Sequence, residues 1–303
     1  MTAKPIYAAI EMGGTKCIVS VGDNPQTARR HRIETRSPDE TIHSIELILR
    51  EEIGPSELDA IGIAGFGPLD VDAQSAHYGR IGRTPKLGWE GTNLVSRLRE
   101  TFACRVIAET DVNSAAIAEA VWRLDVPFQD LAYVTVGTGI GVGIVQNGQI
   151  ANGLSHPEIG HIRVEKHLSD RAFAGTCPFH GDCLEGLASG VAIDARWKTA
   201  LSELPEDHIG VALEAFYLGQ LSANLILHYR PQAIIFGGGV SKTPTLISKI
   251  REESRAHLGS YLPELESATA MKSLVTAPRL GDDAGILGAF MLALDAHSRT
   301  STS

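Results

Sequence analysis

Short apolar runs alternate with glycine-containing turns near the start of the chain. The run Ile6–Ile10 leads into the turn Glu11–Lys16, which contains two glycines, and a second apolar run, Cys17–Val21, follows it. Apolar runs of this length between turn residues are typical of buried strands. Because glycine accepts the backbone geometry of a tight turn, the pattern predicts a β-hairpin with a glycine-containing tip.

The same arrangement recurs in the second part of the chain. The run Leu131–Val136 enters the turn Gly137–Gly141, and Val142–Gln146 returns. Each hairpin is followed downstream by another apolar run that ends at glycines, Ala60–Ala64 in the first part and Ala233–Phe236 in the second. The repetition indicates an internal duplication, and it predicts two α/β domains of similar plan.

Helical periodicity fills the segments between these strands. The predicted helices are Pro38–Glu52, Asn93–Phe102, Val112–Val121, Val211–Tyr229, Lys242–His257 and Ala284–Leu294. We place the domain boundary after Asp111, which gives an N-terminal domain over residues 1–111 and a C-terminal domain over residues 112–283. The last helix, residues 284–297, is expected to pack back on the N-terminal domain.

Composition restricts the class of protein. The 303 residues suffice for two compact domains, and 43% apolar with 21% charged residues is ordinary for a folded globular protein. A formal net charge of −9 argues against a nucleic-acid partner, which would need a basic face. The N-terminus lacks the layout of a signal peptide, and we expect no apolar run long enough to span a bilayer. A cytoplasmic protein without a membrane partner is therefore predicted.

The two glycine tips are candidate phosphate-binding loops. A dinucleotide fingerprint would need a helix directly after Gly137–Gly141, but the apolar residues that follow predict a strand. The first turn also lacks the leading glycine and the final Ser or Thr of a Walker A loop. Two interpretations remain: tight structural turns, or tips whose backbone N–H groups and threonine hydroxyls hold anionic oxygens.

The presence of both tips in one chain favours nucleotide phosphates over two structural turns. A triple glycine follows the apolar run Ala233–Phe236, and it can lie flat under a base. The predicted ATP-binding residues are therefore Gly13, Gly14, Thr15, Lys16, Gly137, Thr138, Gly139, Gly237, Gly238 and Gly239.

Asp111 stands where a strand that begins at Arg105 meets a helix. Open α/β sheets place their chemistry at such carboxyl ends of strands. Aspartate is also a common helix N-cap, so the segment by itself supports a structural and a catalytic role equally. A phosphotransferase needs a carboxylate that accepts the proton of the attacking hydroxyl, and Asp111 is the best-placed candidate for that role.

Two cysteines and two histidines gather in the second half of the chain. His161, Cys177, His180 and Cys183 supply two thiolates and two imidazoles, which form a complete tetrahedral set for Zn²⁺. All four ligands are side chains and leave no position for a reacting water, so a structural zinc is predicted. The alternative is an exposed loop with unrelated Cys and His residues.

Two glutamates flank this cluster. Glu158 precedes His161 by three residues, and Glu185 follows Cys183 by two. A zinc ion would hold both carboxylates in place, which suits bidentate binding of sugar hydroxyls. The alternatives are two solvated acids and, for Glu185, a favourable charge at a helix N-terminus.

Together these residues resemble the ROK family (repressors, open reading frames and kinases) over nearly the whole chain. The turn Glu11–Lys16 is similar to the first phosphate motif of that family, and Gly137–Gly141 is similar to the second. His156–His161 with Cys177–Cys183 resembles its zinc motif, and Gly237–Gly239 resembles its adenosine motif.

The resemblance implies two similar α/β domains of the sugar-kinase/actin-like (ribonuclease H-like) type with an interdomain cleft. It implies an ATP-dependent hexose kinase with Mg²⁺ accompanying ATP, a structural Zn²⁺, and Asp111 as general base. A homodimer is left open. Sugar contacts are expected from Gly65, Asp111, Glu158, His161 and Glu185.

Three positions depart from the commonest family pattern, and all three are similar to the fructokinase branch. They are Glu11 in place of Asp, Thr110 in place of Asn, and His180 in place of Cys. The segments Thr84–Trp89 and Cys177–Gly186 also resemble that branch. Fructose is therefore the expected sugar, and a kinase for glucose, mannose or N-acetylmannosamine is the alternative.

A sugar-responsive regulator of the same family is less favoured. Such regulators resemble the kinases with an added N-terminal helix-turn-helix, whereas the first strand of this chain is expected to start at Ile6. A non-catalytic sugar binder is disfavoured because Asp111 occurs together with both glycine hairpins.

Overall fold

The computed structural model describes residues 4–84, 86–122, 127–153 and 155–298. The chain divides into two compact units. Unit 1 comprises Met1–Ala118, Asn152–His156 and Asp283–Ser303, and unit 2 comprises Glu119–Ala151 and Pro157–Asp282. Each unit contains one five-stranded sheet. The domain boundary expected after Asp111 stays a prediction, because this division describes packing only.

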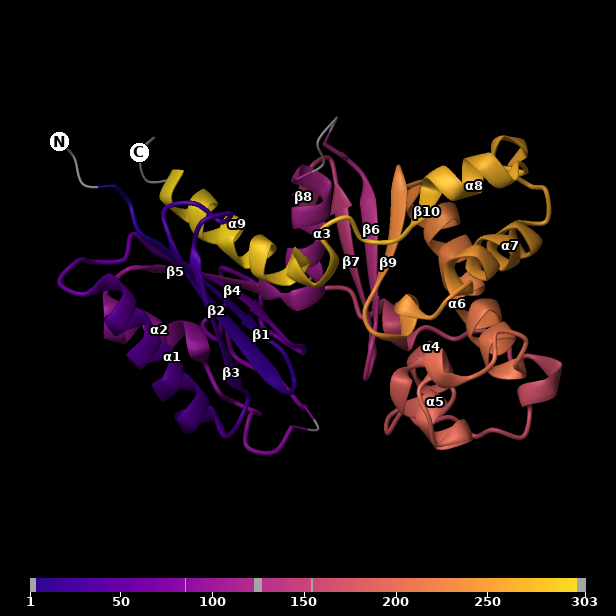
Figure 1. The fold of residues 1–303 in the computed structure, drawn as a ribbon, viewed down its shortest axis with the longest axis horizontal. Coiled ribbons are helices and arrows are strands. Elements are labelled where there is room, and N and C mark those ends of the chain that lie inside the picture. The colour runs from indigo at the N-terminus through magenta and orange to yellow at the C-terminus, as the bar shows by residue number, and fades with distance from the viewer. Residues whose placement is uncertain (1–3, 85, 123–126, 154, 299–303) are drawn as a thin grey trace. The chain divides into compact units, whose positions relative to one another are not determined.

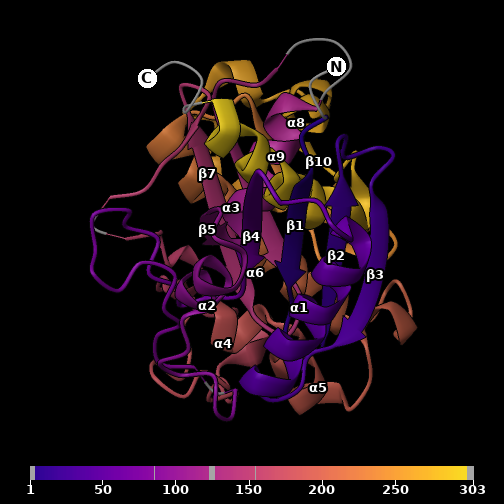
Figure 2. The same ribbon diagram turned by 90° about the vertical axis from the view of Figure 1, so that its left-hand side faces the viewer.

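The sheet of unit 1 has the strand order β3-β2-β1-β4-β5, which can be followed across Figure 2. Antiparallel pairing joins β1 to β2 and β2 to β3, whereas β4 pairs in parallel with both β1 and β5. The five strands are β1 (Tyr7–Met12), β2 (Lys16–Gly22), β3 (Arg29–Glu34), β4 (Ala60–Gly65) and β5 (Arg105–Thr110).

The sheet of unit 2 repeats this plan with the order β8-β7-β6-β9-β10. Its first three strands are again antiparallel neighbours, and β9 pairs in parallel with β6 and β10. The strands are β6 (Leu131–Val136), β7 (Ile140–Gln146), β8 (Gln149–Ile150), β9 (Ala233–Gly237) and β10 (Val275–Thr276). The matching strand orders confirm the predicted duplication and the α/β fold class.

Helices cover both faces of the unit 1 sheet. Helices α1 (Pro38–Ile53) and α2 (Leu94–Phe102) pack with the sheet in one apolar cluster, and α9 (Ala284–Ser298) packs in another with alternate residues of β1 and β4. Figure 1 shows α9 on the side of the sheet opposite to α1 and α2. A Cβ atom on Gly62 would overlap the carbonyl oxygen of Ala289, so this glycine lets α9 approach β4.

Unit 2 is built around helix α6 (Ile209–Tyr229), which packs against α7 (Leu246–Leu258) and belongs to the main apolar cluster. The expectation that no apolar run is long enough to span a bilayer is wrong for α6 by length and composition. Most of this helix is buried inside the unit, as expected for the core helix of a folded domain.

Several short elements escape the sequence patterns. Strand β3 was not predicted because it lies at the edge of its sheet, where four of its six residues are basic and most are exposed. Helices α4 (Leu184–Ala188), α5 (Gly190–Trp197) and α8 (Ala268–Leu274) are too short for a clear helical period. The helix predicted from Lys242 begins at Leu246, after a 3₁₀ turn over Val240–Lys242.

Both predicted turns are shorter than the sequence suggested. Glu11 belongs to β1, and Ile140 and Gly141 belong to β7. The remaining three-residue tips, 13–15 and 137–139, each join two antiparallel strands.

Candidate functional site

The backbone of the first hairpin tip is held by hydrogen bonds on one side, and two of its residues are exposed to solvent. The amide of Gly13 donates to the carbonyl of Lys16 at 2.9 Å, which closes the turn. Thr35 fastens the same tip, since its hydroxyl donates to the Gly13 carbonyl at 2.8 Å and its amide to the Thr15 carbonyl at 3.1 Å. Gly14 and Thr15 are exposed. The tip is therefore rigid and accessible to an anion.

The second tip lies against the carboxylate of Glu185. The amide of Ile140 donates to Oε2 of Glu185 at 2.9 Å, and a Cβ atom on Gly139 would lie 2.5 Å from that oxygen. A Cβ atom on Gly137 would meet nothing within 4 Å. The first amide of α5, at Gly190, donates to the Gly137 carbonyl at 2.7 Å. A side chain at position 139 would thus displace the Glu185 carboxylate, whereas position 137 has room for one.

The triple glycine follows β9. Gly238 has a φ of +84°, and Cβ atoms on Gly237 and Gly238 would overlap the Tyr133 hydroxyl and the Val136 backbone. Gly239 has open space around it. Close packing therefore explains two of the three glycines, and the third is exposed with room for a ligand beside its backbone.

Asp111 is the first residue of α3 (Asp111–Val121), directly after β5. The side chain that caps this helix is Thr110, whose hydroxyl oxygen accepts from the Asn113 amide at 3.2 Å. Oδ1 of Asp111 accepts from the Val112 amide at 2.8 Å. Burial raises the pKa of the Asp111 carboxyl to about 6, against the lowering effect of hydrogen bonds and of nearby His156 and Lys86. Such a carboxyl is suited to accept a proton near neutral pH.

A buried amide network supports this junction. Oε1 of Glu109 accepts from the Thr110 amide at 2.8 Å and from Nδ2 of Asn113 at 3.0 Å. Its Oε2 accepts from Nδ2 of Asn152 at 2.9 Å. The network ties the end of β5 to the segment that carries His156, whose Nε2 accepts from the Leu69 amide at 3.3 Å. The surroundings of Asp111 are therefore fixed by hydrogen bonds within unit 1.

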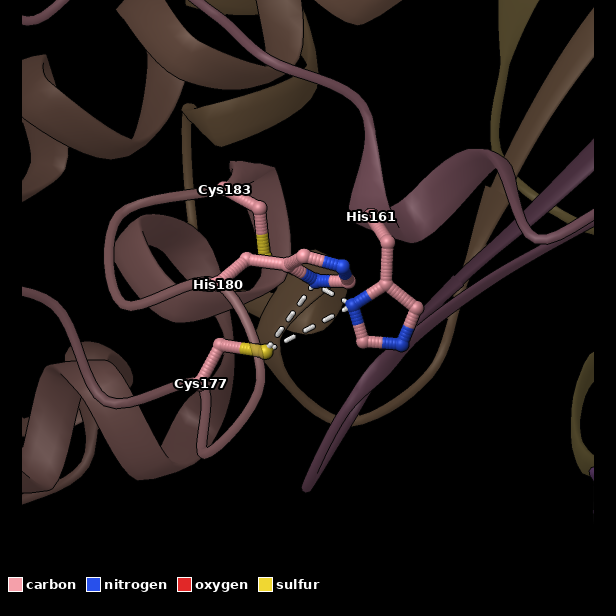
Figure 3. Close-up of side chains that lie close together, drawn as sticks. All are labelled: His161, Cys177, His180 and Cys183. Atoms are coloured by element: carbon pink, nitrogen blue, oxygen red, sulfur yellow. Dashed lines mark hydrogen bonds between the residues drawn. The ribbon is translucent and has the colours of Figure 1, made fainter.

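The four predicted zinc ligands lie together in unit 2. One donor atom from each of His161, Cys177, His180 and Cys183 lies within 4.8 Å of the others, and Figure 3 shows the four side chains converging. Three sulfur-to-nitrogen distances, all involving Nδ1 atoms, are 3.5–3.6 Å. Zinc with bonds of about 2.3 Å to sulfur and about 2.05 Å to nitrogen at tetrahedral angles sets such pairs about 3.6 Å apart. The spacing fits zinc.

Electrostatics also favours a cation here. Burial, together with the neighbouring Cys177, raises the pKa of the Cys183 thiol to about 11. Two thiolates this close therefore need a cation between them, and a divalent metal ion supplies that charge. Backbone bonds between Cys177 and Gly181 close the loop that carries the ligands. The residues present thus fit a structural metal ion.

The residues predicted to contact the sugar belong to both units. Gly65 ends β4 in unit 1, where it is buried. Glu158 is exposed and precedes the 3₁₀ turn Ile159–His161 in unit 2. Nε2 of His161 lies 3.8 Å from Oε1 of Glu185. The structure thus brings His161 and Glu185 together, and it places Gly65 and Asp111 in the other unit.

Comparison with known proteins identifies the family. The sequence model of the ROK family matches residues 7–296. The chain belongs to the ROK family. Fructokinase of Zymomonas mobilis subsp. mobilis is 39% identical over 98% of this chain and 99% of its own. Fructokinase of Lactococcus lactis subsp. cremoris is 35% identical over 95% of this chain and 96% of its own.

A solved ROK structure shares the fold. The ROK family glucokinase from Streptomyces griseus, in complex with glucose and AMPPNP, has a TM-score of 0.69 and 23% identity. The alignment covers 96% of this chain and 99% of the glucokinase. At this identity the likeness concerns the fold, which is that of the actin-like sugar kinases.

Sequence reasoning missed two residues near Asp111 in this ROK protein. Lys86 and His156 both lower the pKa of the Asp111 carboxyl, which indicates that both side chains are close to it. The sequence contained a signal for each, because Lys86 lies in the fructokinase-like segment Thr84–Trp89 and His156 opens the zinc-motif segment. Pro85 of the former segment lies outside the described residues. Neither signal indicated that the side chains reach Asp111.

Proposed function

We propose that this ROK protein is an ATP-dependent fructokinase that converts D-fructose and ATP to fructose 6-phosphate and ADP. The observation that carries the proposal is the identity of 35–39% to two fructokinases along nearly the full length of both chains. The open glycine tips and the junction at Asp111 supply groups that such a reaction needs. A kinase works where ATP is supplied, so we also propose a cytoplasmic location.

Asp111 is the proposed general base. Its carboxylate takes the proton of a fructose hydroxyl while the hydroxyl oxygen bonds to the γ-phosphorus. The bond from that phosphorus to the bridging oxygen breaks, and ADP leaves with the electron pair. The raised pKa of Asp111 supports this role, because the carboxyl is ionised at neutral pH yet is more basic than an ordinary aspartate.

ATP is proposed to bind through backbone groups of the two tips and through Lys16, with Gly239 beneath the base. Magnesium, when bound with ATP, neutralises phosphate charge and prefers oxygen ligands. Glu11 fits such a role in unit 1. Its Oε2 is buried with no hydrogen-bond partner among the described residues, and burial raises its pKa to about 7. A cation nearby would stabilise the ionised form.

Zinc is proposed as the ion held by His161, Cys177, His180 and Cys183. All four ligands are protein side chains, so the ion serves structure rather than catalysis. It would fix His161, and with it the neighbouring Glu185, for contact with sugar hydroxyls. Glu158 and Gly65 are proposed as further sugar contacts.

The test is a panel of hexoses assayed with ATP and Mg²⁺ by coupled detection of ADP. Fructose should give the highest kcat/KM, and fructose 6-phosphate should be the product by chromatography. A higher kcat/KM for glucose, mannose or N-acetylmannosamine would assign another hexose kinase. ADP release at the same rate with and without sugar would refute the kinase proposal.

A further inference from the structure

The side chain of Lys86 ends beside the first phosphate tip, within unit 1. A Cβ atom on Gly14 would overlap Nζ of Lys86 and would lie 3.1 Å from its Cε. The space that any side chain at position 14 would fill is thus taken by the end of Lys86. Gly14 belongs to an exposed turn, so the ammonium lies beside backbone that an anion can reach.

Aromatic packing holds Lys86 in this position. Nζ lies 4.4 Å from the centre of the Phe66 ring, within the range of a cation–π contact. Phe66 packs edge to face on Trp89 with ring centres 5.4 Å apart. The indole nitrogen of Trp89 donates to the carbonyl of Arg36 at 3.0 Å. The lysine therefore rests on a buried aromatic pair fixed to the segment before α1.

The backbone of Lys86 is also anchored on both sides. Its amide donates to the Thr84 hydroxyl at 3.3 Å, and its carbonyl accepts from the Trp89 amide at 3.2 Å. A group held this way loses little entropy when it meets a ligand, which is the property of a preorganised electrostatic site.

Lys86 is half-buried, and in the described part of unit 1 its Nζ makes no hydrogen bond or ion pair within 4.0 Å. Burial lowers the pKa of Lys86, and the charge of Asp111 opposes that effect. A partly desolvated cation without an ion-pair partner is costly to the free protein. An anionic ligand beside Gly14 would remove that cost.

We propose that Lys86 is a catalytic residue whose ammonium contacts the phosphoryl group during its transfer. The inference rests on the proposed kinase function. As the fructose oxygen bonds to the γ-phosphorus and the bond to the ADP oxygen breaks, negative charge is carried by the equatorial oxygens. The lysine between Gly14 and the surroundings of Asp111 neutralises this charge, while the hydroxyl proton passes to Asp111.

The experiment compares Lys86→Met and Lys86→Arg with the parent. Lys86→Met should lower kcat by about 10²–10³-fold, the usual effect of losing one preorganised donor to a transition state. KM for fructose and the Kd for ATP should stay within about threefold. Lys86→Arg, which keeps the charge, should have a kcat at least about tenfold above that of Lys86→Met. The control is Lys4→Met, which removes an exposed lysine paired with Asp23 and should keep the parental kcat.

A second measurement separates charge from packing. Propylammonium added to Lys86→Ala should restore part of kcat, whereas propanol should not. A kcat of Lys86→Met within about threefold of the parent would overturn the proposal. So would a loss confined to KM for fructose, which would make Lys86 a sugar ligand. A parent without sugar-dependent ADP release would instead refute the kinase function itself, so the two failures are distinguishable.

Discussion

The carboxylate of Glu185 lies 3.8 Å from Nε2 of His161 through one oxygen and accepts the amide of Ile140 at 2.9 Å through the other. His161 presents its Nδ1 to the two thiols, so its Nε2 is the nitrogen available to this carboxylate. The 3.8 Å distance is longer than a hydrogen bond, and a carboxylate that closes it would orient a metal-bound imidazole and raise its basicity. Glu185 therefore links the metal cluster to the second phosphate tip within unit 2.

Substitution of Glu185 by Gln should weaken both metal and sugar binding. The amide oxygen can still accept from Ile140, but the negative charge beside His161 is lost. We expect zinc affinity to fall by about 10–100-fold, the usual effect of removing such a partner of a ligating histidine. Competition with a zinc chelator gives the metal affinity, and calorimetry with fructose gives the sugar affinity. If this variant binds zinc with the parental affinity, Glu185 does not support the metal site and acts only on the sugar and on the second hairpin.

Loss of the zinc ligands should act on sugar more than on ATP. Cys177→Ser and Cys183→Ser each remove one thiolate, so metal content and Tm should both fall, because metal binding is coupled to folding of its loop. Sugar affinity should weaken, and ATP affinity should change less, because Glu185 links the cluster to only the second of the two phosphate tips. Cys104→Ser is the matched control, since Cys104 lies in unit 1 and outside the cluster. A metal-free double variant with parental Tm and sugar affinity would contradict the structural role.

Asp111→Asn should remove the base and leave the fold intact. The amide keeps an oxygen for the Val112 amide, and Thr110 still caps the helix. We expect kcat to fall by about 10²–10⁴-fold, the usual contribution of a positioned general base, with fructose affinity near that of the parent. Turnover close to the parental value would mean that Asp111 serves only the first turn of α3.

The acid limb of kcat/KM should report the same carboxyl. Burial raises the pKa of Asp111 to about 6, so its basic form is lost as the pH falls through 6, and kcat/KM should then drop about tenfold per pH unit. Glu11 is a second carboxyl in unit 1 whose pKa is raised, to about 7. Glu11→Gln should keep the limb near pH 6, whereas the residual rate of Asp111→Asn should lack it. If kcat/KM of the parent stays constant down to pH 5, Asp111 is not the base.

The elements of the fold that could be predicted are those whose buried residues leave an apolar pattern in the sequence. The hairpins were visible because their strands are continuous apolar runs, and the helices because their apolar residues recur with a helical period. Strand β3 was not visible, since an exposed edge strand needs no apolar face and here carries four basic residues. The repeated pattern predicted two domains of similar plan, but it did not predict the order of the strands within either sheet.

The metal cluster could be predicted because its ligands lie close in sequence and their chemistry is specific. The links between Glu185 and Ile140, and between Lys86 and Gly14, could not. Each joins segments more than forty residues apart through a space that a glycine leaves empty, and nothing local in the sequence records that space. Such contacts depend on how the loops fold over the sheets.

The two glycines of the second tip should respond differently to alanine. A Cβ atom on Gly137 meets nothing within 4 Å, so Gly137→Ala should fold normally and obstruct only a ligand that approaches the backbone. We expect its KM for ATP to rise by about tenfold or more, which corresponds to about 1.4 kcal/mol, with KM for fructose and Tm unchanged. Gly139→Ala would displace the Glu185 carboxylate, so it should alter fructose affinity and Tm as well. Gly153→Ala, at another open position outside both tips, is the control. If Gly137→Ala binds ATP as the parent does, this tip is a structural turn and the phosphates lie elsewhere.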